Sequence, residues 1–214
     1  MRIRQLFSRS RTLALFTVIT LAGACEGPVV EEAQESAGVP ERIVAIGDIH
    51  GDLDAARAAL RLAGAIDIED QWIGGELVVV QTGDILDRGD DEAEIWALFH
   101  RLREEAPKVG GAVHILNGNH ELMNSYLDYR YVTEGGLVEF EGVGEMEPDD
   151  SLLASMEPSH RDRAAAFRPG APLALSLAER TLAVTIGKTI FTHAGILPEH
   201  VDLGLDRIDR KSVV

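Results

Sequence analysis

Four short segments of the sequence place possible metal ligands directly beside glycine. They are residues 47–51, 83–89, 118–121 and 193–195, and each contains an oxygen or imidazole donor from aspartate, asparagine or histidine. Glycine lets the backbone turn tightly and lets another group approach it closely. Mixed carboxylate, amide and imidazole donors suit Mn, Fe or Zn, whereas an all-oxygen set would indicate Mg or Ca. The four segments therefore predict a site for transition-metal ions.

The first three segments each follow a short apolar run that is typical of a buried strand. The runs are residues 42–46, 77–80 and 113–116. Because ligands bind at the carboxyl edge of an open α/β sheet, the segments should converge in space although they are far apart in the sequence. Two further strands are expected at 181–186 and 189–192, directly before the fourth segment.

Two amphipathic helices are expected between the first three strands. The first begins after Asp52, which can cap it, and ends near Gly64. The second begins at Asp90 or Asp91 and ends at Pro107. This alternation of strands and helices predicts a doubly wound α/β layer structure.

Length and charge limit the functions that the chain can have. With 214 residues and 45% hydrophobic content, it can form one α/β domain with a sizeable core. Its formal charge of −16 argues against binding to nucleic acid or to an anionic membrane surface. A phosphate substrate would be repelled as well, unless bound divalent cations reversed the local field.

The N-terminal residues are typical of an export signal rather than of a folded element. Basic residues precede an apolar stretch that is too short to span a bilayer, which predicts a signal peptide over residues 1–25. Residues 21–25 resemble a bacterial lipobox and end at Cys25, so we expect a periplasmic protein or one anchored to a membrane through a lipid on Cys25. An ordinary signal peptide with an incidental cysteine is the alternative. Residues 26–41 are acidic and small, which predicts a flexible linker before a domain at 42–214.

In order and in type, the four segments resemble the motifs of the calcineurin-like metallophosphoesterases, in particular of the phosphoprotein phosphatase branch. Residues 123–124, 129–132 and 167–170 further resemble the Shewanella-like protein phosphatases, and the resemblance covers about residues 42–198. It implies an α/β fold, a β-sandwich flanked by helices, with a mostly helical insertion at about 122–170. A further histidine motif of the family is not reached before Val214, so we expect a truncated, incomplete C-terminal part.

The resemblance also implies a pair of divalent metal ions. One would be held by Asp48, His50 and Asp84, and the other by Asp84, Asn119 and His193, so that Asp84 bridges the two. A hydroxide shared by the two ions would attack the phosphoryl group.

Three further residues are implied to act on the substrate directly or through a neighbour. His120 would be the general acid that protonates the leaving group. Asp87 would orient the His120 ring, and Arg88 would bind the phosphate, whose oxygens a planar guanidinium can contact in pairs.

These roles imply a metal-dependent phosphomonoester hydrolase that acts on phosphorylated proteins, peptides or small phosphoesters, at serine, threonine or tyrosine. Two other hypotheses stay open: a dinucleoside polyphosphate hydrolase, and a lipoprotein whose truncated domain binds phosphate or a partner without turnover. Taken singly, the residues also have ordinary explanations, because Asp48 or Asp84 could cap a helix and Arg88 could form a surface ion pair.

Overall fold

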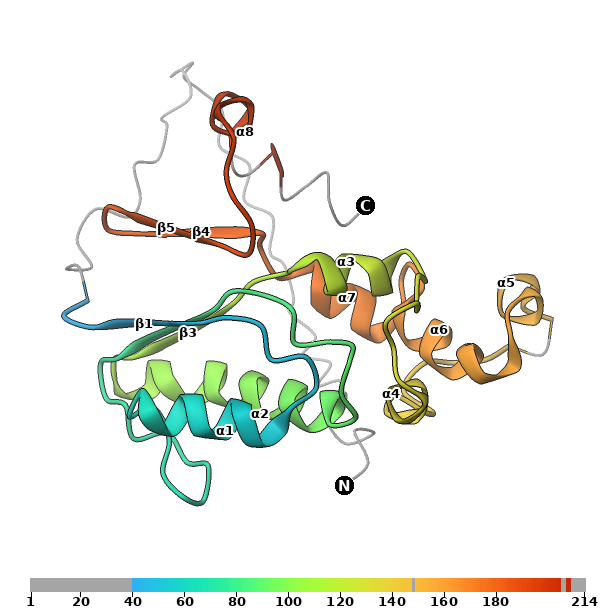
Figure 1. Ribbon diagram of the computed structural model, residues 1–214, viewed down its shortest axis with the longest axis horizontal. Coiled ribbons are helices and arrows are strands. Elements are labelled where there is room, and N and C mark those ends of the chain that lie inside the picture. The colour runs from blue at the N-terminus through green and yellow to red at the C-terminus, as the bar shows by residue number, and fades with distance from the viewer. Residues whose placement is uncertain (1–39, 148, 205–206, 209–214) are drawn as a thin grey trace, which may run out of the picture.

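The computed structural model describes residues 40–147, 149–204 and 207–208 (Figure 1). The predicted signal peptide, Cys25 and nearly all of the linker predicted at 26–41 lie outside the described residues, so they stay predictions. Among the described residues, no helix combines the length and the apolar character that crossing a membrane requires.

Three parallel strands form the central sheet, in the order β1-β2-β3. They are β1 (Ile43–Ile46), β2 (Val78–Gln81) and β3 (Ala112–Ile115), which confirms the strands predicted from the apolar runs. Ile46 pairs with Gln81, and Gln81 pairs with Ile115, so the three strands end at the same level. The residues that follow them therefore lie along one edge of the sheet.

Two helices cover one face of this sheet, as Figure 1 shows. They are α1 (Leu53–Leu62) and α2 (Glu92–Glu105), and the short 3-10 helix η2 (Ala106–Val109) follows α2. The side chain of Asp52 accepts a hydrogen bond from the backbone N–H of Ala55 at 2.9 Å, which confirms the predicted cap of α1. Apart from Trp96, the buried apolar side chains of both helices pack in one cluster with those on this face of the sheet.

An antiparallel hairpin covers the opposite face of the sheet (Figure 1). Its strands are β4 (Ala183–Ile186) and β5 (Thr189–Thr192). Val80 of β2 packs with Phe191 of the hairpin, whereas Val79 packs with the helices, because successive side chains of a strand point to opposite faces. The molecule is therefore a β-sandwich flanked by helices. The doubly wound prediction is wrong because both connecting helices lie on one face; an apolar run indicates that a strand is covered, but not by what.

The chain between β3 and β4 is mostly helical, and we call it the helical region. Its helices are α3 (Asn119–Ser125), α4 (Glu134–Val138), α5 (Ser151–Ser155), η3 (Pro158–His160), α6 (Arg161–Phe167) and α7 (Pro172–Ala178), and α8 (Pro198–Leu203) follows the hairpin. In Figure 1, α4, α5 and α6 extend away from the sheet on the side of α3. Phe140 and Phe167 of this region pack with Trp96 of α2 and with Leu86, which follows β2. The helical region thus contacts a loop at the carboxyl edge of the sheet directly.

Candidate active site

The five predicted metal ligands meet at the carboxyl edge of the central sheet. Asp48 and His50 follow β1, Asp84 follows β2, Asn119 opens α3 directly after β3, and His193 follows β5. Donor atoms of neighbouring residues in this set are no more than 3.7 Å apart. The fold therefore brings donors from four separate loops into one cluster, while their role as metal ligands stays a prediction.

Asp84 lies at the centre of the cluster and is only 2% exposed. Its Oδ2 atom lies 3.7 Å from His50 Nε2 and 3.3 Å from His193 Nε2. The donors form two groups of three, and within each group the ligand atoms lie within 4.8 Å of one another. The groups are His50, Asp84 and His120, and Asp48, Asp84 and His193. Asp84 belongs to both groups, as a residue between two ions would. His120 takes the place in the first group that the family resemblance assigns to Asp48.

His50 offers a direct test of whether the cluster fits a metal ion. Its Nδ1 atom donates a hydrogen bond to the backbone carbonyl of Leu86 at 3.0 Å, so in the neutral ring Nε2 carries the lone pair. Nε2 is buried without a hydrogen-bond partner and faces Asp48 Oδ2 at 3.6 Å. A buried polar atom without a partner costs free energy, and a lone pair facing a carboxylate adds repulsion. A cation between them would remove both costs, so the donor set fits a divalent metal ion.

His193 closes the other side of the cluster. Its Nε2 atom donates a hydrogen bond to Asn119 Oδ1 at 3.0 Å, and its Nδ1 atom lies 3.7 Å from Asp48 Oδ1. Imidazole must offer a lone pair to bind a metal, so Nε2 could bind an ion only in the tautomer that carries its proton on Nδ1.

Four candidate site residues have a left-handed backbone, which is unusual for residues other than glycine. The φ angle is 52° at His50, 59° at Asp84, 68° at Asp87 and 69° at Arg88. Such a conformation costs of order 1–3 kcal/mol per residue and persists only where the surroundings fix it. The loops at the sheet edge must therefore be held by strong local contacts.

Glu121 supplies much of this support and had no assigned role in the sequence analysis. Its Oε2 atom accepts hydrogen bonds from the backbone N–H groups of Asp84 at 2.7 Å and Gly118 at 2.8 Å. Its Oε1 atom accepts from those of Ile85 at 2.9 Å and Leu86 at 3.3 Å. A single buried carboxylate thus joins the loop after β2 to the start of α3.

Glycine at the loop contacts is required by close packing of backbone against backbone. A Cβ atom on Gly83 would lie 2.4 Å from the backbone nitrogen of Gly118. One on Gly51 would lie 2.7 Å from the backbone of Gly89. The glycines that flank the donors therefore let the loops after β1, β2 and β3 touch.

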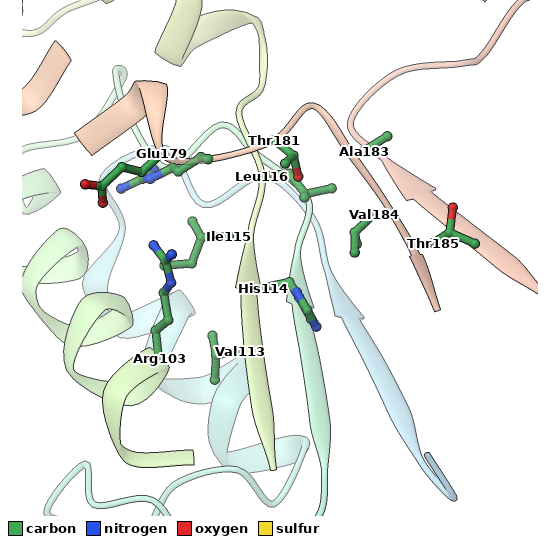
Figure 2. A pocket seen from close by; sticks show the side chains of 11 residues that line it. Arg103, Val113, His114, Ile115, Leu116, Glu179, Thr181, Ala183, Val184 and Thr185 are labelled. Atoms are coloured by element: carbon green, nitrogen blue, oxygen red, sulfur yellow. The ribbon is translucent and has the colours of Figure 1, made fainter. Parts of the chain in front are cut away.

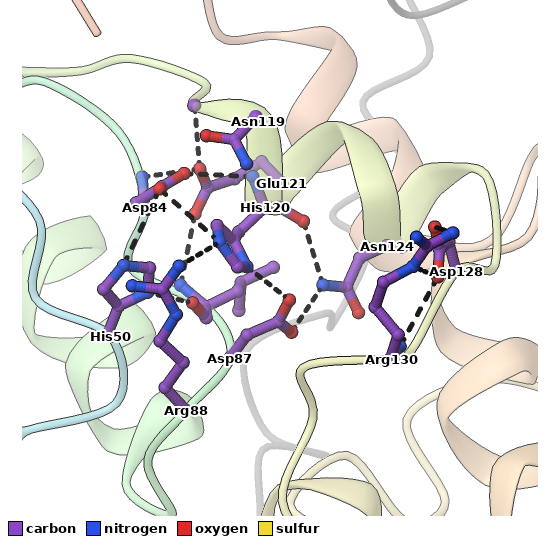
Figure 3. A network of polar contacts seen from close by, with 12 residues as sticks. His50, Asp84, Asp87, Arg88, Asn119, His120, Glu121, Asn124, Asp128 and Arg130 are labelled. Carbon is purple, nitrogen blue, oxygen red and sulfur yellow. Dashed lines mark hydrogen bonds and ion pairs between the residues drawn. The ribbon is translucent and has the colours of Figure 1, made fainter.

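An imidazole and a carboxylate form a buried pair beside the cluster, and Figure 3 shows them pointing toward each other. His120 Nδ1 lies 2.6 Å from Asp87 Oδ2. Because the carboxylate accepts, Nδ1 carries the proton, and Nε2 accepts a hydrogen bond from Arg88 Nη2 at 3.1 Å. Nε2 also lies 3.9 Å from Asp84 Oδ2. This arrangement aims one imidazole nitrogen at the predicted metal ligands and fixes the other with a carboxylate.

Sequence reasoning missed three buried residues around Asp87. Arg163 Nη2 and Asn124 Nδ2 donate to Asp87 Oδ1 at 3.2 Å and 2.9 Å, and Glu92 Oε1 accepts from the backbone N–H of Asp87 at 2.6 Å. Burial raises the pKa of Glu92 to about 7, although the charge and hydrogen bond of Arg163 oppose this shift. Asn124 lies in a segment that the family resemblance singles out, but Glu92 and Arg163 stand beside no donor segment.

A pocket of about 420 Å³ lies elsewhere, along β3 (Figure 2). Arg103, His114, Thr181 and Thr185 are among the residues that line it, and none of the predicted metal ligands does. We therefore place the candidate active site at the donor cluster, where titratable side chains converge, and not at this pocket.

The family model for calcineurin-like phosphoesterases matches residues 41–203. The chain belongs to the calcineurin-like phosphoesterase family. This confirms the family and the fold that the four segments implied, and the matched range contains every residue of the donor cluster.

Known proteins similar to this calcineurin-like phosphoesterase include Shewanella-like protein phosphatase 2 of Arabidopsis thaliana, which is 39% identical over 198 residues, or 80% of this chain and 51% of the relative. Shewanella-like protein phosphatase 1 of Plasmodium berghei (strain Anka) is 40% identical over 91 residues, or 42% of this chain and 25% of the relative. Among solved structures, the cold-active protein-tyrosine phosphatase of a psychrophile Shewanella species matches with a TM-score of 0.64 and 27% identity, over 80% of this chain and 49% of that chain. The chain thus spans about half the length of the first relative and of this solved structure.

Proposed function

We propose that this protein is a metal-dependent phosphomonoester hydrolase. The observation that carries the proposal is the position of Asp84 Oδ2, which lies close to three imidazole nitrogens. The Nε2 atoms of His50, His193 and His120 are 3.7 Å, 3.3 Å and 3.9 Å from it. A shared carboxylate between two donor groups, next to an oriented imidazole, is what hydrolysis by a metal pair and a general acid requires.

The five residues of the donor cluster would hold two divalent ions, of which Mn, Fe or Zn suit these donor types best. When bound, the ions would lower the pKa of a water molecule and neutralise the charge on the phosphoryl oxygens. Their positive charge would also overcome the repulsion between a phosphate and a chain of formal charge −16.

The chain's own residues would bind the phosphate and transfer the proton. Arg88 is exposed, and its Nη2 atom lies 3.1 Å from His120 Nε2. A bound phosphate could accept hydrogen bonds from this guanidinium in place of His120. With Arg88 on the phosphate, His120 Nε2 would be free to take up a proton from water. His120, held by Asp87 through Nδ1, would then donate that Nε2 proton to the leaving oxygen.

Phosphorylated proteins or peptides are the substrates that we propose. The similar proteins from Arabidopsis thaliana and Plasmodium berghei are named protein phosphatases, and the similar Shewanella structure is named a protein-tyrosine phosphatase. Turnover of matched phosphoserine, phosphothreonine and phosphotyrosine peptides would decide among the three targets.

The test is hydrolysis of p-nitrophenyl phosphate by the purified chain with and without Mn²⁺. We expect Mn²⁺ to stimulate the reaction, and Asp84→Asn to lower the rate by at least about a hundredfold, because losing even an outer-shell residue of a metal site costs 10–100-fold. Asp54→Asn, an exposed aspartate of α1, is the matched control and should retain the full rate.

Three outcomes would contradict the proposal. Unchanged turnover in Asp84→Asn would remove the bridging role of Asp84. Faster cleavage of a dinucleoside tetraphosphate than of aryl phosphates would indicate the dinucleoside polyphosphate hydrolase. Bound metal without hydrolysis of any phosphoester would indicate a binding protein.

A further inference from the structure

We propose that Arg163 is a positioning residue of the active site: it fixes the Asp87 carboxylate in the orientation that accepts the N–H of His120. This inference rests on the proposed function, in which His120 protonates the leaving group. Because Arg163 belongs to α6, the helical region beyond the sheet supplies a working part of the site.

The guanidinium of Arg163 is fully buried, and each of its nitrogens donates a hydrogen bond. Nε donates to Asn124 Oδ1 at 2.8 Å. Nη1 donates to Glu92 Oε2 and to the carbonyl of Gly136, both at 2.6 Å. Nη2 donates to Asp87 Oδ1 at 3.2 Å. Only a planar fork of donors can satisfy these four acceptors at once, so the site is specific for arginine.

The two oxygens of Asp87 have different partners. Oδ1 accepts from Arg163 and from Asn124 Nδ2 at 2.9 Å, which leaves Oδ2 for His120 Nδ1 at 2.6 Å. The backbone N–H of Asp87, whose φ angle is 68°, donates to Glu92 Oε1, and Arg163 holds the other oxygen of the same glutamate. Arg163 therefore constrains both the side chain and the main chain of Asp87.

Three aromatic rings surround the guanidinium and keep it in one place. Its Cζ atom lies 5.2 Å from the ring centre of Phe167, 5.3 Å from that of Phe140 and 5.9 Å from that of Tyr129. A cation is attracted to the face of an aromatic ring, most strongly where water is excluded. All three rings come from the helical region, so this region determines where Arg163 can place its donors.

A buried ion pair can also serve folding alone, so the test must separate the two roles. If Arg163 acts through Asp87 and His120, its loss should slow proton donation to the leaving group. Phenyl phosphate needs that proton, because its phenolate is a poor leaving group. The phenolate of p-nitrophenyl phosphate leaves readily without it. A loosened structure would slow both reactions alike.

The experiment compares kcat on these two esters for the unaltered chain and for Arg163→Lys, which keeps the charge but not the fork. We expect kcat on phenyl phosphate to fall about tenfold to a hundredfold and kcat on p-nitrophenyl phosphate by less than about threefold, with KM and metal content unchanged. Arg161→Lys is the matched control on the same helix, because within the described residues the Arg161 side chain donates only to the carbonyls of Met156 and Ala154. It should match the unaltered chain.

A second variant and a second measurement cover the case in which Arg163→Lys does not fold. Asn124→Ser removes the other donor to Asp87 Oδ1 and should give the same substrate-dependent loss. In the metal-free protein, the far-downfield proton NMR signal of the His120 Nδ1–H should move upfield in either variant but not in Arg161→Lys.

Equal losses on both esters together with an unmoved His120 signal would overturn the inference and leave Arg163 a structural residue. No hydrolysis by the unaltered chain, with the His120 signal moved as expected in the variants, would refute the proposed function while supporting the positioning of Asp87 by Arg163.

Discussion

The candidate site has a metal side and an acid side, which differ in how far the protein alone satisfies their polar groups. On the metal side, the Asp48 side chain is 52% exposed and the buried Nε2 atom of His50 has no hydrogen-bond partner. On the acid side, Asp87 and Arg163 are fully buried and hydrogen-bonded throughout. Bound cations would satisfy the donors of the proposed metal side, whereas the acid side is organised by the protein alone.

Glu121 offers the test with the largest expected effect, because it holds the loops of the metal side through their backbone N–H groups and is not itself a predicted metal ligand. Each carboxylate oxygen of Glu121 accepts from two backbone N–H groups. In Glu121→Gln, an NH₂ group replaces one of these oxygens, so two of the N–H groups face a donor. We expect the free energy of unfolding to fall by about 3 kcal/mol, as two buried donors lose a charged acceptor. Urea unfolding of the metal-free protein measures this loss.

Glu104→Ala, on an exposed glutamate of α2, is the control and should change stability little. A loss below about 1 kcal/mol in Glu121→Gln would mean that the loops after β2 and β3 hold their shape by other contacts.

Glu92 tests how much stability the buried acid side loses as the pH rises. Burial raises its pKa from 4.5 to about 7, so the folded state keeps a proton that the unfolded state releases between these values. Stability of the unaltered chain therefore falls as pH rises through this window, and Glu92→Gln lacks that titration. Relative to the unaltered chain, the variant should gain about 2–3 kcal/mol between pH 5 and pH 8, measured by urea unfolding. A difference that stays constant with pH would contradict the assignment.

Substitution of Arg130, which lies in the same helical region as Arg163, should have the smallest effect. Arg130 forms an exposed ion pair with Asp128 at 2.8 Å, drawn at the right of Figure 3. Exposed ion pairs contribute little, so Arg130→Ala should leave metal content, unfolding and hydrolysis of p-nitrophenyl phosphate unchanged. A lower rate on phosphopeptides alone would show that the outer surface of this region contacts substrate.

The elements that position the metal side could be predicted from the sequence because their signals are local. Apolar runs define β1, β2 and β3, Asp52 caps α1 as predicted, and parallel strands bring the residues that follow them to one edge. The hairpin on the second face could not be placed, since Val79 and Val80 are equally apolar although they face different partners.

On the acid side, the family resemblance implied His120 and Asp87, but the buried residues around Asp87 escaped prediction. Their contacts are long-range, and their charges resemble those of surface residues. Arg163 bonds to Asn124, Glu92 and Asp87, which are 39, 71 and 76 positions away. In the sequence it stands in a charged stretch with Arg161 and Asp162, which is typical of an exposed helix end. One local hint exists: the four residues that follow it, 164–167, are all apolar, and a charge beside them on a short helix is readily buried.

The left-handed residues at the sheet edge limit how this site could be transplanted. His50, Asp84, Asp87 and Arg88 adopt a main-chain shape that most host proteins reserve for glycine. Grafting the same side chains onto an ordinary loop would aim them in other directions, even with every residue type preserved. A designer would have to carry over the whole set of loops, with the buried glutamate that braces them.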